Sequence, residues 1–309
     1  MAELAATEPK SGRLRFNIND PQWLGLTLIA PTFGIVLGFL LFPFLYALVL
    51  SFMHYNLSNP NATAFIRIEN YLELLTDRYF ISAVQRTIVF SIVSVVLEVL
   101  LGISIAIVLD QKFRFQGLMR GLIILPWALP TVVNGIMWKW IYNADYGALN
   151  ALLTQLGVLQ EYQVWLADPN WAMALVIFAN VWKETPFTVI LVLAALQGIP
   201  AELYEAGKVD GTSAWQSLWH ITLPLLRPVI MIAALLQVIW GFQTFDLIYI
   251  VTSGGPFNST ELVAYRLYLQ TFKFFEFGYG SAMAYMVTLF LLIPAIFYIR
   301  SAYRNIVEY

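Results

Sequence analysis

Three side chains in an otherwise apolar stretch have the types and the spacing to bind a polar solute. Gln237, Trp240 and Thr244 lie at positions i, i+3 and i+7, on one face of a helix, with Gln243 at its edge. Amides can hydrogen-bond sugar hydroxyls, and an aromatic ring can cover the apolar side of a sugar. We therefore expect a sugar path here, although both glutamines could instead only bridge helices. Further candidates for this path are Asn134, Asn180 and Tyr285.

Residues for covalent chemistry are few. The sequence has no cysteine, and its two histidines, His54 and His220, are too far apart for a zinc motif. It also lacks a G-x-x-x-x-G-K-[ST] stretch, which would bind nucleotide phosphates. These observations disfavour a membrane-embedded enzyme and predict no cofactor in this chain, so that ATP and magnesium would bind elsewhere. No basic run suggests nucleic acid.

Four ionisable residues fall inside apolar stretches: Glu98, Lys183, Glu184 and Asp246. Such groups are costly in lipid and normally face protein or water. Their scatter over three expected helices favours interhelical hydrogen bonds over a proton relay. Lys183 and Glu184 are adjacent, which is not the spacing of a helical ion pair, so we do not expect them to pair.

The composition identifies the class of protein that must position these residues. Of the 309 residues, 60% are hydrophobic and 12% are charged, against about 25% charged in soluble domains. An all-α integral membrane protein is therefore expected, with a polar cytoplasmic tail over 1–22 and a six-span domain over 23–309. The expected spans, each long enough for about 30 Å of hydrocarbon, are 23–52, 83–109, 118–142, 171–196, 228–252 and 279–303.

Lysine and arginine positions predict the orientation. With the N-terminus inside, ten of the 17 fall in internal segments, which agrees in sign with the positive-inside rule. Both termini and the polar stretch 200–227 would then be cytoplasmic.

That polar stretch interrupts the apolar pattern and predicts two short helices around a turn. Pro200 suits the first turn of a helix, and Asp210-Gly211 is a strong turn pair. Ser213 with Gln216 forms a capping box for the second helix, which Leu223-Pro224 is expected to end.

The same residues resemble the EAA loop of ABC importer permeases. The match covers Glu205-Ala206-Gly207, Asp210-Gly211 and Ile221-Thr222-Leu223-Pro224, and its mild departure is Gly207, where alanine is commoner. The resemblance implies a type I ABC importer permease fold with a cytoplasmic coupling helix that docks on an ATPase subunit. The residues it assigns to coupling are Glu205, Ala206, Gly207, Asp210, Gly211, Leu223 and Pro224.

A second resemblance follows the fifth expected span. Phe245-Asp246-Leu247-Ile248-Tyr249 and Thr252-Ser253-Gly254-Gly255-Pro256 resemble the signature of maltose-type carbohydrate permeases. This family implies a homologous second permease, two ABC ATPase subunits and an extracellular or periplasmic sugar-binding protein, in a bacterial or archaeal plasma membrane. The chain would conduct a carbohydrate and use ATP hydrolysed by its partners.

Two other functions remain open on the sequence. A secondary sugar transporter could have similar spans but would not need the coupling loop. An ABC permease for a non-sugar solute such as glycerol phosphate would keep the loop. The sequence does not choose the sugar, nor whether this chain or its partner permease holds it.

Overall fold

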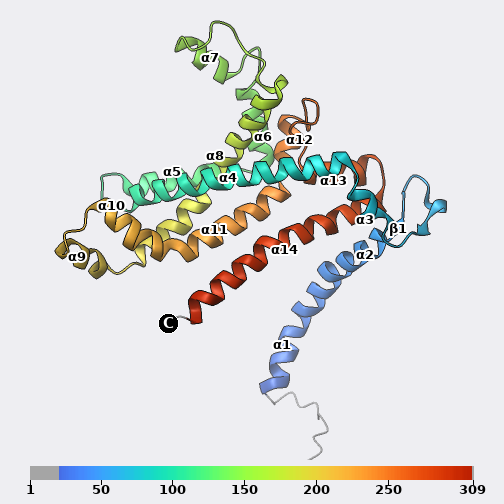
Figure 1. Ribbon diagram of the computed structural model, residues 1–309, viewed down its shortest axis with the longest axis horizontal. Helices are drawn as coiled ribbons and strands as arrows, with labels where there is room; N and C mark the ends of the chain where they lie inside the picture. The colour runs from blue at the N-terminus through green and yellow to red at the C-terminus, as the bar shows by residue number, and fades with distance from the viewer. Residues whose placement is uncertain (1–20, 308–309) are drawn as a thin grey trace, which may run out of the picture.

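The computed structural model describes residues 21–307, which are mostly helical (Figure 1). The expected tail over 1–22 lies outside the described residues, apart from its last two. In chain order the helical elements are α1 (Pro21–Val36), η1 (Leu37–Leu41), α2 (Phe42–Ser51), η2 (Pro60–Ala62), α3 (Glu69–Leu74), α4 (Arg78–Asp110), α5 (Gln116–Ala128), α6 (Thr131–Ile141), α7 (Ala148–Gln155), η3 (Trp165–Ala167), α8 (Pro169–Gln197), α9 (Ala201–Val209), α10 (Ala214–Ser217), η4 (Leu218–Thr222), α11 (Leu223–Gln243), α12 (Asp246–Val251), α13 (Val263–Tyr268), η5 (Leu269–Lys273) and α14 (Phe277–Val307). Two short strands, β1 (Met53–His54) and β2 (Ala64–Phe65), pair antiparallel.

Five segments of the described chain are long and apolar enough to cross a membrane. They are Thr27–Ser51, Arg78–Asp110, Pro169–Gln197, Ala214–Gln243 and Phe277–Arg300. The pair α5 and α6 makes a sixth if it counts as one broken span. The expected all-α membrane fold is confirmed, but two of the expected spans differ in form.

The third expected span, 118–142, is not one helix. It consists of α5 and α6, which are bent by 93° relative to each other. Leu129 has an extended backbone with ψ 135°, as expected for a residue that precedes a proline, and Pro130 is the N-cap of α6. The expectation of one continuous span over 118–142 is therefore wrong, because Leu129 leaves the helix completely.

The fifth expected span, 228–252, begins earlier and ends earlier than the sequence indicates. The helix starts at Ala214, continues through η4 into α11 and ends at Gln243, while α12 is a separate helix after Thr244 and Phe245. Pro224 therefore does not end the second coupling helix, contrary to the expectation. Its ring follows the wide π turn of η4, in which the Leu223 N–H donates to Leu218 O. The π turn η1 precedes Pro43 in the same way.

Helices α4, α8 and α11 pack closely around small residues. A Cβ atom on Gly102 of α4 would lie 2.5 Å from Thr188 Cγ2 of α8, and one on Gly241 of α11 would lie 2.5 Å from Ser91 Oγ of α4. Small residues at such crossings let helix backbones approach within a membrane. These two contacts fix α8 and α11 against α4.

An ionic cluster joins the N-terminal end of α4 to α13 and α14. The Arg266 guanidinium lies 3.5 Å from Glu261 and 4.0 Å from Asp77, and the Tyr279 hydroxyl donates to Asp77 at 3.0 Å. Burial raises the pKa of the Glu261 carboxyl, and the neighbouring Arg266 and Arg86 oppose that shift. In Figure 1 this end, with α3, α13 and the strands, lies opposite α9 and α10.

Candidate functional site

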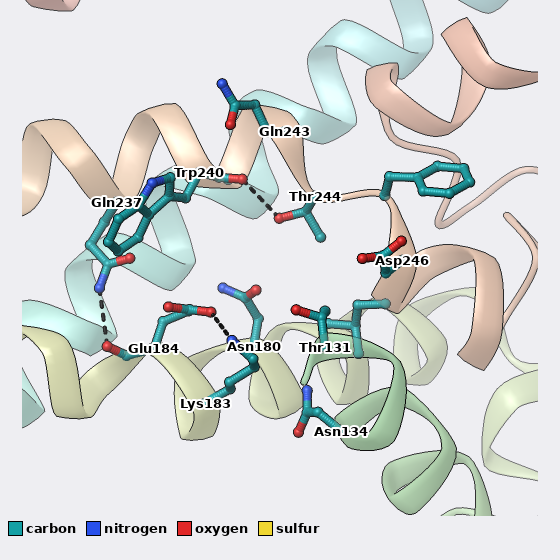
Figure 2. A pocket seen from close by; sticks show the side chains of 13 residues that line it. Thr131, Asn134, Asn180, Lys183, Glu184, Gln237, Trp240, Gln243, Thr244 and Asp246 are labelled. Carbon is teal, nitrogen blue, oxygen red and sulfur yellow. Dashed lines mark hydrogen bonds and ion pairs between the residues drawn. The ribbon is translucent and has the colours of Figure 1, made fainter. Parts of the chain in front are cut away.

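A cavity of about 170 Å³ lies where the α5–α6 break and the α11–α12 break meet α8 (Figure 2). Polar side chains reach it from α6, α8, α11 and α12, and an indole ring covers part of its wall. The lining residues are Thr131, Asn134, Asn180, Lys183, Glu184, Gln237, Trp240, Gly241, Gln243, Thr244, Phe245, Asp246 and Leu247.

Six of the seven expected path residues line this cavity together: Asn134, Asn180, Gln237, Trp240, Gln243 and Thr244. Tyr285 does not line it. Its hydroxyl donates to the Phe44 carbonyl, and the two rings lie 5.1 Å apart, because α14 packs against α2 at this level. The structure therefore separates Tyr285 from the other candidates.

The two glutamines of α11 have different surroundings. Gln237 is buried, and its amide donates to the Glu184 carbonyl at 3.2 Å and to Thr188 Oγ1 at 3.4 Å. Gln243 is exposed at the end of the helix. Gln237 thus joins α11 to α8, whereas the Gln243 amide is accessible to a solute.

Trp240 is held in place by other aromatic rings. Its ring meets Phe187 of α8 edge to face at a centroid distance of 4.7 Å, and Phe187 stacks on Trp127 of α5 at 6.0 Å. The Thr244 hydroxyl donates to the Trp240 carbonyl at 3.0 Å, which satisfies one acceptor at the helix end. The indole therefore presents a fixed apolar surface to the cavity.

On α8, the polar side chains pair with one another. Lys183 Nζ lies 2.8 Å from Glu184 Oε1, so the expectation that these neighbours do not pair is wrong. Their long side chains bend toward each other beside the cavity, which the helical spacing alone does not reveal (Figure 2). Asn180 donates to Glu98 Oε1 on α4 at 3.0 Å, and Glu98 itself is buried.

The two broken helices meet at the cavity. Gly135 of α6 packs on Ile250 of α12, where a Cβ atom would lie 3.2 Å from the isoleucine side chain. Asn134, one residue earlier, is fully buried, and neither polar atom of its side chain has a hydrogen-bond partner within the described chain. A buried amide without a partner is costly, so this side chain has unused capacity for a solute or a water molecule.

The turn between α9 and α10 forms as the sequence predicts. Gly211 has φ +77°, a conformation that favours glycine, and α9 ends just before it at Val209. The capping box is complete: the Gln216 N–H donates to Ser213 Oγ, and the Ser213 N–H donates to Gln216 Oε1. Each of these features depends on local backbone geometry.

Gly207 lies where a side chain would contact its neighbours too closely. The Thr212 hydroxyl donates to the Gly207 carbonyl at 2.8 Å. A Cβ atom on Gly207 would lie 2.9 Å from Thr212 Oγ1 and 3.2 Å from Ile221 Cδ1. Alanine would therefore push these two side chains apart. Around this closed turn, Val209, Trp215 and Trp219 expose large apolar surfaces.

The sequence pattern missed four polar lining residues: Thr131, Lys183, Glu184 and Asp246. Three of them are ionisable residues inside apolar stretches, which is itself a signal of a functional site. Thr131 carries no such signal, because only the 93° bend turns the start of α6 into the cavity.

Comparison with known proteins gives consistent matches. Residues 98–307 match the family described as binding-protein-dependent transport system inner membrane component. The trehalose/maltose transport system permease protein MalF of Thermococcus litoralis is 36% identical over 277 residues, covering 90% of this chain and 92% of that protein. The lactose transport system permease protein LacF of Rhizobium radiobacter is 33% identical over 294 residues, covering 94% and 96%.

A solved structure agrees on the fold. One chain of a bacterial ABC transporter that imports the acidic polysaccharide alginate superposes with a TM-score of 0.80 at 22% identity, covering 92% of this chain and 96% of that chain. The match extends over almost all of both chains. This chain therefore belongs to the family of binding-protein-dependent transport system inner membrane components and has the type I fold of ABC importer permeases.

Proposed function

We propose that this chain is the permease subunit of an ATP-driven sugar importer, in which one helix links the ATPase-binding end to the sugar cavity. The observation that carries the proposal is the continuous helix Ala214–Gln243. The capped turn of the coupling unit lies at its start, and Trp240 and Gln243 line the cavity at its end. Displacement of α9 and α10 by an ATPase subunit would thus displace the cavity wall.

The lining of the cavity supports a sugar as the solute. It combines the Trp240 ring with the Asn180 and Gln243 amides and the Thr131 and Thr244 hydroxyls. Relatives described as trehalose/maltose and lactose permeases agree with this class of solute. The cavity is smaller than the 300–1,000 Å³ of typical ligand pockets, so a homologous second permease would supply the other half of the path.

The remaining subunits follow from the same proposal. One of two ATPase subunits would bind the exposed apolar surface around α9 and α10, both would hold ATP and magnesium, and this chain would catalyse no reaction. An external sugar-binding protein would deliver the solute; a periplasmic protein accompanies the solved alginate transporter. The chain would lie in a bacterial or archaeal plasma membrane with both termini and residues 200–227 in the cytoplasm.

Subunit composition and energy source test this proposal together. The tagged chain should copurify with ATPase subunits and a second permease. The reconstituted complex with its binding protein should take up radiolabelled trehalose, maltose or lactose only when ATP is present. A chain that purifies alone and takes up sugar with an ion gradient would instead be a secondary transporter. ATP-driven uptake of glycerol phosphate but of no sugar would support an ABC importer and contradict a sugar as its solute.

A further inference from the structure

The cavity contains a single cation, and that cation is already paired. Among the described residues that line it, only Lys183 carries a positive charge, against the carboxylates of Glu184 and Asp246. The Lys183–Glu184 pair is largely buried, with 11% and 16% of the side chains exposed. A solute that enters the cavity therefore meets no free cation.

The remaining polar groups on α8 present hydrogen-bond acceptors. Asn180 donates one of its two N–H bonds to Glu98 on α4, and its carbonyl oxygen can accept from a solute in the cavity. The Glu184 carboxylate is also an acceptor, and so is Asp246 at the start of α12. Sugar hydroxyls can donate to all three groups, whereas phosphate and carboxylate groups are acceptors at neutral pH.

We propose that Glu184 is a specificity-determining residue: by occupying Lys183, it makes the cavity accept uncharged saccharides and reject phosphorylated or carboxylated solutes. This inference rests on the proposed sugar cavity and names the charge class of its solute. The fold alone does not determine that class, because the solved neighbour imports an acidic polysaccharide. Removal of one partner of a buried ion pair leaves an uncompensated charge, so Lys183 without Glu184 would attract an anion.

Equilibrium binding to the complete purified importer, without the binding protein, tests the proposal. The probes are trehalose, maltose and lactose, each compared with its own 6-phosphate by isothermal titration calorimetry. The wild-type complex should bind the 6-phosphate at least tenfold more weakly than the sugar. Glu184→Gln should strengthen 6-phosphate binding at least tenfold, and the preference is measured as the ratio of the two affinities.

Matched variants separate charge from structure. Glu184→Asp keeps the carboxylate and should keep the wild-type preference, and the double variant Lys183→Gln/Glu184→Gln removes the freed cation and should lose the gain. An unchanged preference in Glu184→Gln, or an equal gain in the double variant, would overturn the assignment. If Glu184→Gln does not assemble, Asp246→Asn provides the second test, since this side chain is exposed. It should strengthen 6-phosphate binding about threefold, and no gain would count against the proposal.

The same measurements separate the role of Glu184 from the proposed sugar import. A wild-type importer that binds a neutral sugar while Glu184→Gln shows no altered preference refutes the role of Glu184 and leaves the sugar importer intact. A wild-type importer that neither binds nor takes up any neutral sugar refutes both.

Discussion

Trp215 and Trp240 lie on one uninterrupted helical rod, about 35–40 Å apart along its axis. Trp215 is exposed beside the turn after α9, and Trp240 lines the cavity. The rod passes Pro224 and Pro228 without a break, and the π turn η4 lies directly before Pro224. A rigid element that contacts both sites is a physical means of coupling between them.

The first prediction concerns orientation. The chain has no native cysteine, so single cysteines can be labelled without background. Val209→Cys at the end of α9 and Phe257→Cys after α12 replace residues that are 88% and 92% exposed. In intact cells a membrane-impermeant thiol reagent should label Phe257→Cys only, and after permeabilisation it should label both. Labelling of Val209→Cys alone in intact cells would reverse the proposed orientation.

The second prediction concerns the coupling turn. Gly211→Val should abolish sugar uptake while the chain still inserts, because a β-branched residue at φ +77° is strained by more than the 1–2 kcal/mol typical of this region. Gly157→Val is the matched control: it has φ +72°, and its Cβ also points into open space, but it follows α7. Uptake and copurification of the ATPase subunits report the effect. Equal losses in both variants would mean that strain alone, and not coupling, explains the defect.

The third prediction separates the two glutamines. Gln237→Leu should lower the thermal stability of the purified importer, because it loses two hydrogen bonds to α8, each contributing about 1 kcal/mol. Gln243→Ala should leave stability unchanged and raise the apparent KM for sugar uptake, since its amide is exposed at the cavity. If Gln243→Ala lowered the thermal stability and Gln237→Leu only raised the apparent KM, Gln243 would be the structural residue and Gln237 the one that contacts sugar.

The fourth prediction concerns the aromatic wall. Trp240→Ala should reduce sugar uptake at least tenfold without changing subunit assembly or basal ATP hydrolysis, and Trp240→Phe should retain part of the uptake. Trp140→Ala on α6 removes an exposed indole that does not line the cavity and serves as the control. Normal uptake in Trp240→Ala at a normal expression level would move the sugar path away from α11.

Features that depend on local backbone geometry could be predicted from the sequence. The turn at Gly211 and the cap at Ser213 follow from the backbone preferences of those residues. The helical period places Gln237 and Trp240 on the side of α11 that lines the cavity, since residues three apart share a face, and Thr244 follows as the C-cap of α11.

Features that depend on long-range packing could not be predicted from the sequence. The rule that a proline ends a helix holds for a regular α-helix, and the π turn before Pro224 has no sequence signature of its own. Lys183 and Glu184 pair because the shared cavity turns both side chains inward. Tyr285 does not line the cavity because α14 packs on α2. This packing could not be predicted from the sequence of α14 alone.

The number of sugar molecules imported per ATP hydrolysed, measured in proteoliposomes, tests transmission along the rod most directly. The double variant Leu225→Gly/Ile232→Gly lowers the helix propensity at two exposed positions of the rod, by about 1 kcal/mol each, and changes neither the coupling turn nor the cavity lining. Val96→Gly/Leu100→Gly makes the same change at exposed positions of α4. If the rod transmits ATPase motion, the ratio falls severalfold in the first variant while ATP hydrolysis continues, and the second variant keeps the wild-type ratio. An unchanged ratio in the first variant, or an equal fall in both, would contradict transmission through the helix Ala214–Gln243.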